Sequence, residues 1–516
     1  MNGEILIAGR QRCRSERSRI IGLSAAVGLL AFLLYAWTAQ RGISWQDSGE
    51  YQYKFLTQAY TWDVGSGIAR LHPTYILLTR ALAFCLPFVS VPYVYALSSG
   101  LGMAVALCAL ALTVYAITQS SHAAWVSVVL LGGSQMAWWL SAMTEVYTWS
   151  LAFLMLELVC LCQSLKLQRF RWFLGALFFN GCHFGVHNFA LLHLPVYAVL
   201  FLTYFRRPVW RWGACAGVWC LGAAPILPLI IQCAVESRNA ETVVQSVLFG
   251  HYFQQKVFNL DVRNGPLWAA NMALSSCSFF NPCWAYVVFG GMALSVKRRA
   301  ALMKRGGIQA FSLYGSLLAL TGIHFVFWVR YIVPDQATFI LPTLGLLAVW
   351  AGIGAAHVLQ ARRLFLVSLL TAAGFSVMAP VIFFHVAERY VPPRTRVLPF
   401  RDEFAYWAYP WKQNENSAER FVASVASHVY PEKMVVWADT TAVAPLMVAQ
   451  AMGRLPSTWT WLTYWQNLPD EEIERRLRES PNGGYVLSPI PCYVPSSILK
   501  RAKTFEQEGL FYRIVW

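Results

Sequence analysis

The chain has 516 residues, of which 57% are hydrophobic, 15% aromatic and 13% charged, with a formal net charge of +16. So much apolar surface cannot be enclosed in one water-soluble core, and the composition therefore indicates a polytopic membrane protein. Lys and Arg fall in short clusters between apolar runs, as in cytoplasmic membrane loops, so the positive charge does not point to nucleic-acid binding.

The N-terminal segment, residues 1–19, is strongly basic. It carries arginines at positions 10, 12, 14, 17 and 19, directly before an apolar run from about Ile20 to Trp37. That run has no convincing small-residue cleavage site. The pattern therefore predicts a retained signal anchor with a cytoplasmic tail.

Apolar stretches predict eleven spans within a transmembrane module at 20–385, since a crossing needs about 20 residues. They lie near 20–38, 93–117, 122–140, 146–165, 172–187, 188–205, 213–233, 278–296, 308–329, 336–357 and 364–385. A shorter stretch, 74–90, contains Arg80 and Pro87. Counting it as a span would place the basic cluster at Lys166 outside, so we predict an amphipathic helix along the outer interface.

Residues 386–516 differ in composition, because 14 of the 25 acidic residues lie there and no run is long enough to span. This indicates an extracytoplasmic domain with its own core. Periodicity predicts strands at Met434–Ala438, Gly484–Ser488 and Phe511–Val515 and helices at Thr441–Met452 and Asp470–Arg478. The predicted fold class is therefore mostly α, a helical membrane bundle followed by a small α/β domain.

Two acids follow the first span in the motif Asp47-Ser48-Gly49-Glu50. Residues three apart share a face of a helical turn, so both carboxylates could act on one bound group. The alternative role is a helix N-cap, which Asp47 or Ser48 could fill alone. Acidic residues are scarce in the membrane part, however, and charges at the mouth of a bundle are usually functional.

The same topology places six polar residues on the outer face: Asp47, Glu50, His72, Glu145, Arg330 and Asp335. Glu145 ends the third span, where it could meet the first loop or only mark the interface. Arg330 could anchor its helix at the membrane interface, or its guanidinium could bind a phosphate with two parallel hydrogen bonds.

Histidines provide a further candidate site. His183 and His187 are four residues apart, a spacing that can bind a metal, and Asn188 follows them. Histidines that are hydrogen-bonded within a bundle are nevertheless commoner than metal ligands. Glu157 lies deeper, in the fourth span, and is expected to pair with a neighbouring helix rather than to act in catalysis.

Several motifs together resemble the bacterial membrane proteins related to protein O-mannosyltransferases, within the GT-C glycosyltransferases. They are D-S-G-E at 47–50, W-D-V-G at 62–65, H-P at 72–73, T-E-V-Y at 144–147, H-F-G-V-H-N at 183–188, R-Y-I-V-P-D-Q-A-T-F-I-L-P at 330–342 and R-D-E-F-A-Y-W-A-Y-P-W-K at 401–412. Their order and their predicted membrane side make the resemblance.

The resemblance implies a bacterial inner-membrane enzyme that moves a sugar from a polyprenyl-phosphate donor to a hydroxyl of a protein or glycan outside the cytoplasm. It makes Asp47 the general base, places Glu50 and Glu145 at the acceptor or a metal, and puts His72 near the donor phosphate. The remaining predicted substrate-binding residues are His187, Asn188, Arg330 and Asp335.

The chemistry leads to the same requirements without the family. A sugar on a lipid phosphate already has a good leaving group, so the enzyme needs a carboxylate to accept the acceptor proton and a positive charge for the departing phosphate. Asp47 meets the first requirement. Arg330 meets the second, or else a divalent cation, Mg²⁺ or Mn²⁺, held by Asp47 and Glu50. Direct displacement with one base inverts the anomeric carbon.

Two other classes of protein remain as alternatives. A transporter or a flippase for lipid-linked sugars would use intramembrane acids as a path and would show charges near the midplane and inverted repeats. Here the acids gather at one face and no repeat is visible. An assembly scaffold would tolerate replacement of Asp47.

Overall fold

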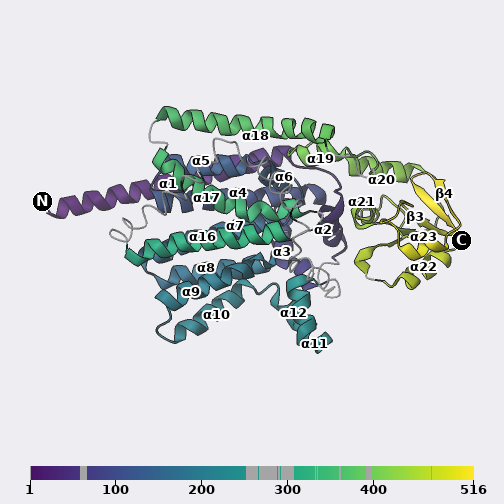
Figure 1. Cartoon of the computed structure of the whole chain (residues 1–516), viewed down its shortest axis with the longest axis horizontal. Helices are drawn as coiled ribbons and strands as arrows, with labels where there is room; N and C mark the ends of the chain where they lie inside the picture. The colour runs from purple at the N-terminus through teal and green to yellow at the C-terminus, as the bar shows by residue number, and fades with distance from the viewer. Residues whose placement is uncertain are drawn as a thin grey trace.

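The computed structural model describes residues 2–58, 67–250, 307–331, 335–358, 362–390, 398–466 and 468–516, together with 265, 288, 291 and 333. The molecule is elongated, with a bundle of roughly parallel helices and a small domain containing a sheet at one end (Figure 1). The two chain termini lie at opposite ends of the long axis. This is the predicted fold class, a helical membrane bundle with a small α/β domain.

Among the described residues, six helical segments are long and apolar enough to cross a membrane. They are Ile20–Thr38 of α1 (Asn2–Thr38), α4 (Val91–Thr118), α7 (Tyr147–Leu167), Ser312–Arg330 of α16 (Gly307–Arg330), Gln336–His357 of η5 (Gln336–Ile340) and α17 (Leu341–Val358), and Arg363–Tyr390 of α18 (Arg362–Tyr390). Two bent helix pairs raise the number to as many as eight: α5 (Ser121–Gly132) with α6 (Gln135–Ser141), and α10 (Trp210–Gly222) with α11 (Leu227–Ser237).

These eight segments coincide with eight of the eleven predicted spans. Two others, 172–187 and 188–205, match shorter helices, namely α8 (Phe170–Phe184) and η3 (Asn188–His193) with α9 (Leu194–Tyr204). Most of the span predicted at 278–296 lies outside the described residues. Continuous crossings at 122–140 and 213–233 were wrong, because α5 and α6 meet at 70° and α10 and α11 meet at 91°. Pro225 and Pro228 at the second corner cannot donate backbone hydrogen bonds, which ends α10.

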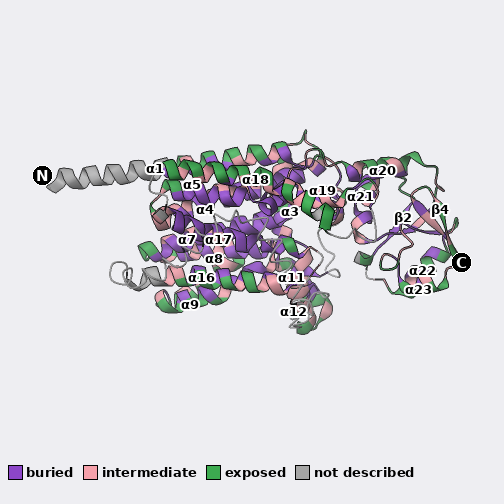
Figure 2. Cartoon of the chain, turned by 45° about the horizontal axis from the view of Figure 1, so that its top comes forward, coloured by how far each residue is buried: buried purple, intermediate pink, exposed green. Residues whose placement is uncertain are grey.

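The bundle has a buried centre and an exposed periphery (Figure 2). Within the crossing segments, 89% of the α17 window is buried, whereas only 22% of the α18 window is. The exposed face of α18 carries apolar side chains such as Val367 and Leu370. Because lipid is as apolar as these side chains, a helix at the edge of a bundle keeps hydrophobic residues on its outer face.

The helix predicted at 74–90 is observed as α3 (Pro73–Cys85). At 1.5 Å per residue it is about 20 Å long, shorter than the roughly 30 Å of a hydrocarbon core. Leu77 and Phe84 on this helix, and Phe88 beyond it, are exposed. An orientation along the interface stays a prediction, for which this exposed apolar surface is suitable.

The C-terminal domain contains a five-stranded sheet with the order β2-β1-β3-β5-β4. The strands are β1 (Val435–Trp437), β2 (Thr460–Leu462), β3 (Gly484–Val486), β4 (Thr504–Glu508) and β5 (Phe511–Val515). The first pairs with β2 and β3 in parallel, while β5 is antiparallel to β3 and β4. The helices are α19 (Glu403–Ala408), α20 (Ser417–Ser427), α21 (Thr440–Ala451), α22 (Asp470–Arg478) and α23 (Ser496–Arg501).

The predicted strands and helices of this domain are all confirmed to within a few residues. Strands β2 and β4 were missed, because β2 has three residues and β4 reads as the polar run T-F-E-Q-E. The domain also begins later than the predicted residue 386, since α18 continues to Tyr390. A helix can extend past the bilayer surface, so the end of an apolar run does not mark the end of the helix.

The domain is attached to the bundle through α6 and α19. The amide of Gln135 donates to the carbonyl of Trp407 at 2.6 Å, and the indole of Trp139 donates to the carbonyl of Tyr406 at 2.9 Å. The rings of Trp139 and Trp407 are stacked with centroids 5.0 Å apart. These contacts connect the bundle with the first helix of the domain.

Candidate active site

Helix α2 (Gln46–Thr57) lies between the bundle and the C-terminal domain (Figure 1). Trp45, just before it, is fully buried and stacks on Phe421 of α20 with ring centroids 5.2 Å apart. Its indole donates to the hydroxyl of Ser417 at 2.8 Å. The C-terminal domain therefore holds the start of α2, and with it the position of Asp47.

Gly49 allows α2 to pack closely on this domain. A Cβ atom at this position would lie 2.3 Å from the carbonyl oxygen of Ser44 and 2.9 Å from the Cβ of Ala444 in α21. Backbone and a helix in contact cannot move aside as a flexible side chain can. The glycine of the D-S-G-E motif is therefore required by packing.

Ser48 connects the motif to a second acid. Its hydroxyl donates to the carbonyl of Thr144 at 2.8 Å and lies 3.3 Å from a carboxylate oxygen of Glu145. The backbone N–H of Glu145 donates to the hydroxyl of Ser99 at 2.8 Å. As predicted, the outer end of the third span meets the first loop.

Glu50 is neutralised by two cations. Lys54, one helical turn further along, forms an ion pair with it, and a guanidinium nitrogen of Arg70 lies 3.6 Å from its other oxygen. Burial by itself would raise the pKa of Glu50, but Lys54 and Arg70 outweigh burial and hold this pKa below its usual value. Glu50 is thus ionised and forms ion pairs with both cations, and it holds Arg70 beside α2.

Two cavities meet at the motif. The first, of about 390 Å³, lies among α2, η3, α16 and α12 (Ala240–Phe249) and has a mostly apolar lining that includes Phe189, Leu191, Leu192, Leu248, Phe249 and Phe327. The second, of about 510 Å³, lies between the bundle and the C-terminal domain and is lined by Glu145, Trp139, Trp407, Trp437, Tyr464 and Asp470 among others. Both are lined by Asp47, Arg70, Val333 and Asp335.

Asp47 therefore lies at the junction of an apolar and a more polar cavity. Asp47 is an exposed residue, and it lines both cavities. Loss of hydration in the protein mass around it, followed by the negative charges of Glu50 and Asp335, raises the pKa of Asp47 to about 7. Burial also raises the pKa of Glu145 and of Asp335. At neutral pH, Asp47 can accept a proton without being permanently protonated.

His72 has a left-handed backbone conformation, with φ of 48°. Its Nδ1–H donates to the carbonyl of Val186 at 2.6 Å. Burial lowers the pKa of His72 to about 4, so the ring is neutral at neutral pH and its Nε2 is an acceptor. It stacks on His187, with centroids 5.9 Å apart, and both rings line the first cavity. His72 therefore lines the first cavity but brings no positive charge.

The remaining predicted residues separate into two groups. Asp335 and Asn188 line the first cavity, and the amide of Asn188 donates to the carbonyl of Leu248 at 2.7 Å. Arg330, at the end of α16, is not among the residues that line either cavity. The W-D-V-G motif at 62–65 lies outside the described residues.

Sequence reasoning missed Arg70 and Lys54. The position of Lys54, four residues after Glu50, was a signal for an ion pair on one helix face. Arg70 lies two residues before His72 in the same outer loop, and nothing in the sequence distinguishes it from Arg330 as the cation of the site. Only the fold brings Arg70 next to Glu50.

A divalent cation between Asp47 and Glu50 does not fit these contacts, because the carboxylate of Glu50 is already held by Lys54 and Arg70. In the described part of the chain, three potential ligand atoms lie within 4.8 Å of one another only in the group Glu157, His183 and His193. That group lines neither cavity. The two histidines of the i, i+4 pair separate: His183 is hydrogen-bonded within the bundle, whereas α8 ends at Phe184, so His187 follows the helix and lines the first cavity.

Comparison with known proteins gives a fold. The structure of ArnT from Cupriavidus metallidurans bound to undecaprenyl phosphate matches over 96% of this chain and 97% of its own, at 13% identity and a TM-score of 0.54. The apo structure of the same protein matches over 96% of this chain and 98% of its own, with a TM-score of 0.51. The Archaeoglobus fulgidus oligosaccharyltransferase, tethered to an acceptor peptide, matches over 91% of this chain and 68% of its own, at 12% identity and a TM-score of 0.50.

No family model matches the chain, and no curated protein matches it in sequence. The likeness to the solved structures is at the level of the fold, and it extends over both the bundle and the C-terminal domain. The chain has the GT-C fold.

The contact at Gly49 can be tested by adding a single methyl group. Gly49→Ala should destabilise the protein by about 1–3 kcal/mol, because the new Cβ overlaps with backbone and with α21. Thermal unfolding in detergent measures the effect. The control is Gly374→Ala on the exposed side of α18, where a Cβ meets nothing within 4 Å. Equal melting temperatures for the two variants would show that α2 does not need this close contact.

Proposed function

We propose that the chain is an integral-membrane glycosyltransferase that moves a sugar from a polyprenyl-phosphate donor to an acceptor hydroxyl, with Asp47 as the general base. The observation that carries the proposal is the place of Asp47 and Arg70 at the junction of an apolar and a polar cavity. The fold shared with an ArnT structure bound to undecaprenyl phosphate supports a donor of this chemical class.

The apolar first cavity suits the lipid-linked donor. Its aromatic and leucine side chains can pack on a polyprenyl chain, and Arg70 at its polar end can bind the phosphate with two parallel hydrogen bonds. The ion pair with Glu50 holds Arg70 in place without removing its charge from the cavity. His72, His187 and Asn188 form the adjoining wall and can accept or donate hydrogen bonds to the sugar.

The second cavity suits the acceptor. It lies on the other side of Asp47, is rich in aromatic side chains and includes residues of the C-terminal domain. Glu145 and Asp335 line this cavity and can form hydrogen bonds with an acceptor hydroxyl. A protein or a glycan remains the expected acceptor.

The reaction is then a direct displacement. The acceptor oxygen attacks the anomeric carbon and loses its proton to Asp47, while the bond from that carbon to the phosphate oxygen breaks. The electron pair leaves with polyprenyl phosphate, whose charge Arg70 stabilises. One displacement inverts the anomeric carbon. General-base catalysis of this kind contributes roughly 100- to 10,000-fold.

The proposed site faces the extracytoplasmic side of a bacterial inner membrane. The basic N-terminal tail supports a cytoplasmic position for one end of the molecule, and the C-terminal domain lies at the other end (Figure 1). A transporter or flippase would use a charged path through the bundle. The deeply buried acid Glu157 does not favour one, because it lines neither of the two cavities.

Replacing the base tests the assignment directly. Asp47→Asn should lower the rate of sugar transfer from polyprenyl-phosphate donors by roughly 100- to 10,000-fold, because the amide cannot accept the proton. Transfer is measured in membranes with radiolabelled donor. The matched control is Asp402→Asn, which keeps the N-cap of α19 and should leave transfer unchanged. Full transfer by Asp47→Asn would remove Asp47 as the base.

The pKa of Asp47 determines the direction of the pH dependence. This carboxyl has a pKa of about 7, so the base is protonated and inactive at lower pH. We expect kcat/KM to fall about tenfold for each pH unit below 7 and to level off above it. Steady-state rates between pH 5.5 and 8.5 check this. A flat profile down to pH 5.5 would contradict the raised pKa.

Removing the cation should weaken donor binding. Arg70→Gln should raise the KM for the donor by roughly 10- to 100-fold, the magnitude of a lost charge-assisted hydrogen bond. Arg70→Lys should be intermediate, because it keeps the charge but not the planar fork. Arg330→Gln is the comparison, and the cavity lining predicts a smaller effect for it. A larger effect at Arg330 would return the phosphate-binding role to that residue.

A further inference from the structure

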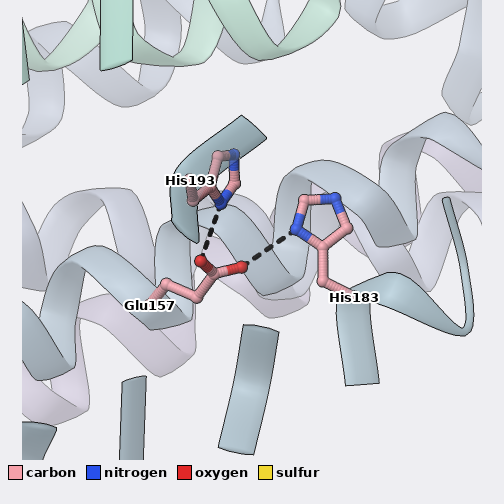
Figure 3. Close-up of side chains that lie close together, drawn as sticks. All are labelled: Glu157, His183 and His193. Atoms are coloured by element: carbon pink, nitrogen blue, oxygen red, sulfur yellow. Dashed lines mark hydrogen bonds and ion pairs between the residues drawn. The ribbon is translucent and has the colours of Figure 1, made fainter. Parts of the chain in front are cut away.

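A closed polar cluster lies inside the bundle, away from the proposed catalytic residues (Figure 3). One carboxylate oxygen of Glu157, on α7, lies 2.9 Å from Nδ1 of His183, and the other lies 2.8 Å from Nδ1 of His193. All three side chains are fully buried. They come from three different elements, α7, α8 and η3.

Further donors complete the cluster. The hydroxyl of Tyr197 and the amide of Asn180, at 3.1 Å, both donate to Glu157. On the far sides of the two imidazoles, Ser150 lies 2.7 Å from Nε2 of His183, and His324 lies 2.8 Å from Nε2 of His193. If each of these contacts carries one proton, every donor in the network has an acceptor. The carboxylate then accepts four hydrogen bonds, which is its full capacity.

The distances favour hydrogen bonds over a metal. Separations of 2.8 and 2.9 Å between nitrogen and oxygen are ordinary hydrogen-bond lengths. A tetrahedral metal with bonds of about 2.0–2.1 Å would hold its ligand atoms about 3.3 Å apart. Every ligand atom of the trio also has a partner within the protein. The cluster therefore holds itself together by shared protons.

The cluster brackets one wall of the first cavity. The segment between its two histidines, residues 184–192, supplies His187, Asn188, Phe189, Leu191 and Leu192 to the cavity lining. Both ends of this segment are thus bonded to the same carboxylate. Asn180 holds its middle as well, because its amide also donates to the carbonyl of Ala190 at 2.9 Å.

The opposite side of the segment is bonded to the outer loop. His72 donates to the carbonyl of Val186, and the backbone N–H of Thr74 donates to the carbonyl of Gly185 at 2.9 Å. The backbone N–H groups of Val186 and His187 both donate to the carbonyl of His183. A shift of the His183 ring would therefore move the backbone that holds His72 and His187 in the cavity wall.

We propose that Glu157 is a positioning residue that sets the shape of the donor cavity by clamping segment 184–192 at both ends. This rests on the proposed function only for the identity of the ligand. Without the carboxylate, four buried donors lose their shared acceptor, and such groups rearrange to find new partners. The segment then shifts and the cavity no longer fits the lipid phosphate.

The test is binding of undecaprenyl phosphate to the purified full chain in detergent. Glu157→Gln keeps the shape of the side chain but removes its charge and one acceptor, and should weaken binding roughly tenfold or more. The matched control is Glu388→Gln, which disrupts a Glu–His pair with His385 at 4.0 Å whose side chains are 60% and 70% exposed. It should leave the dissociation constant unchanged.

A milder variant guards against loss of folding. Tyr197→Phe removes only one donor to Glu157 and should weaken binding in the same direction by a few-fold. Both constants are measured on the folded protein. If Glu157 has a positioning role, the substitution raises KM for the donor more than it lowers kcat. A purely structural role would lower the melting temperature and leave the dissociation constant and KM of the folded fraction unchanged, and that result would overturn the proposal.

Two further outcomes would lead to different conclusions. Stoichiometric transition metal in the wild type that is lost in Glu157→Gln would replace the clamp by a metal site and overturn the hydrogen-bonded network. A wild type that binds undecaprenyl phosphate but transfers no sugar would remove the proposed function, while the comparison of dissociation constants would still decide the role of Glu157.

Discussion

The architecture of the site depends on the packing of the first turn of α2 against the C-terminal domain. Trp45 stacks on α20, and Gly49 brings the helix backbone into contact with α21. Because the turn is held from outside the bundle, Asp47 can project between two cavities. The C-terminal domain is therefore part of the framework of the candidate site, since without it neither Asp47 nor the second cavity would have its present wall.

The two acids of the motif have the same chemistry but opposite environments. Glu50 is buried against Lys54 and Arg70 and stays ionised, whereas Asp47 is exposed to the cavities near Glu50 and Asp335 and has a raised pKa. Separating two carboxylates in this way gives one a structural task and leaves the other available for proton transfer. Arg70 takes part in both, because it neutralises Glu50 and lines both cavities.

Glu157, which is buried inside the bundle, supports the wall of the first cavity in our proposal. Glu157 uses both oxygens to hold elements that otherwise depend largely on apolar contacts, which are not directional. Hydrogen bonds fix the orientation of a segment in a way that packing of leucine and phenylalanine side chains does not. The proposed donor, with its phosphate and sugar, needs this precision in the cavity wall.

Prediction succeeded where the signal was local. The strand around Val436 and the helix Asp470–Arg478 were found from periodicity, and the break near Pro225 could have been found from the proline pair. Strands β2 and β4 were missed because they are short or polar. The different surroundings of His183 and His187 could not be predicted from their spacing, because this spacing implies a shared face only if the helix continues, and α8 ends between them.

The sequence by itself determined the class of the protein, the order of its helices and the motif around Asp47, because hydropathy and local spacing are properties of neighbouring residues. Only the tertiary structure decided which of the two acids can accept a proton and which arginine lies in the cavities. Those outcomes depend on charges contributed by residues 70 and 335 and on the protein mass around them, and electrostatic energies change with distance and burial rather than with position along the chain.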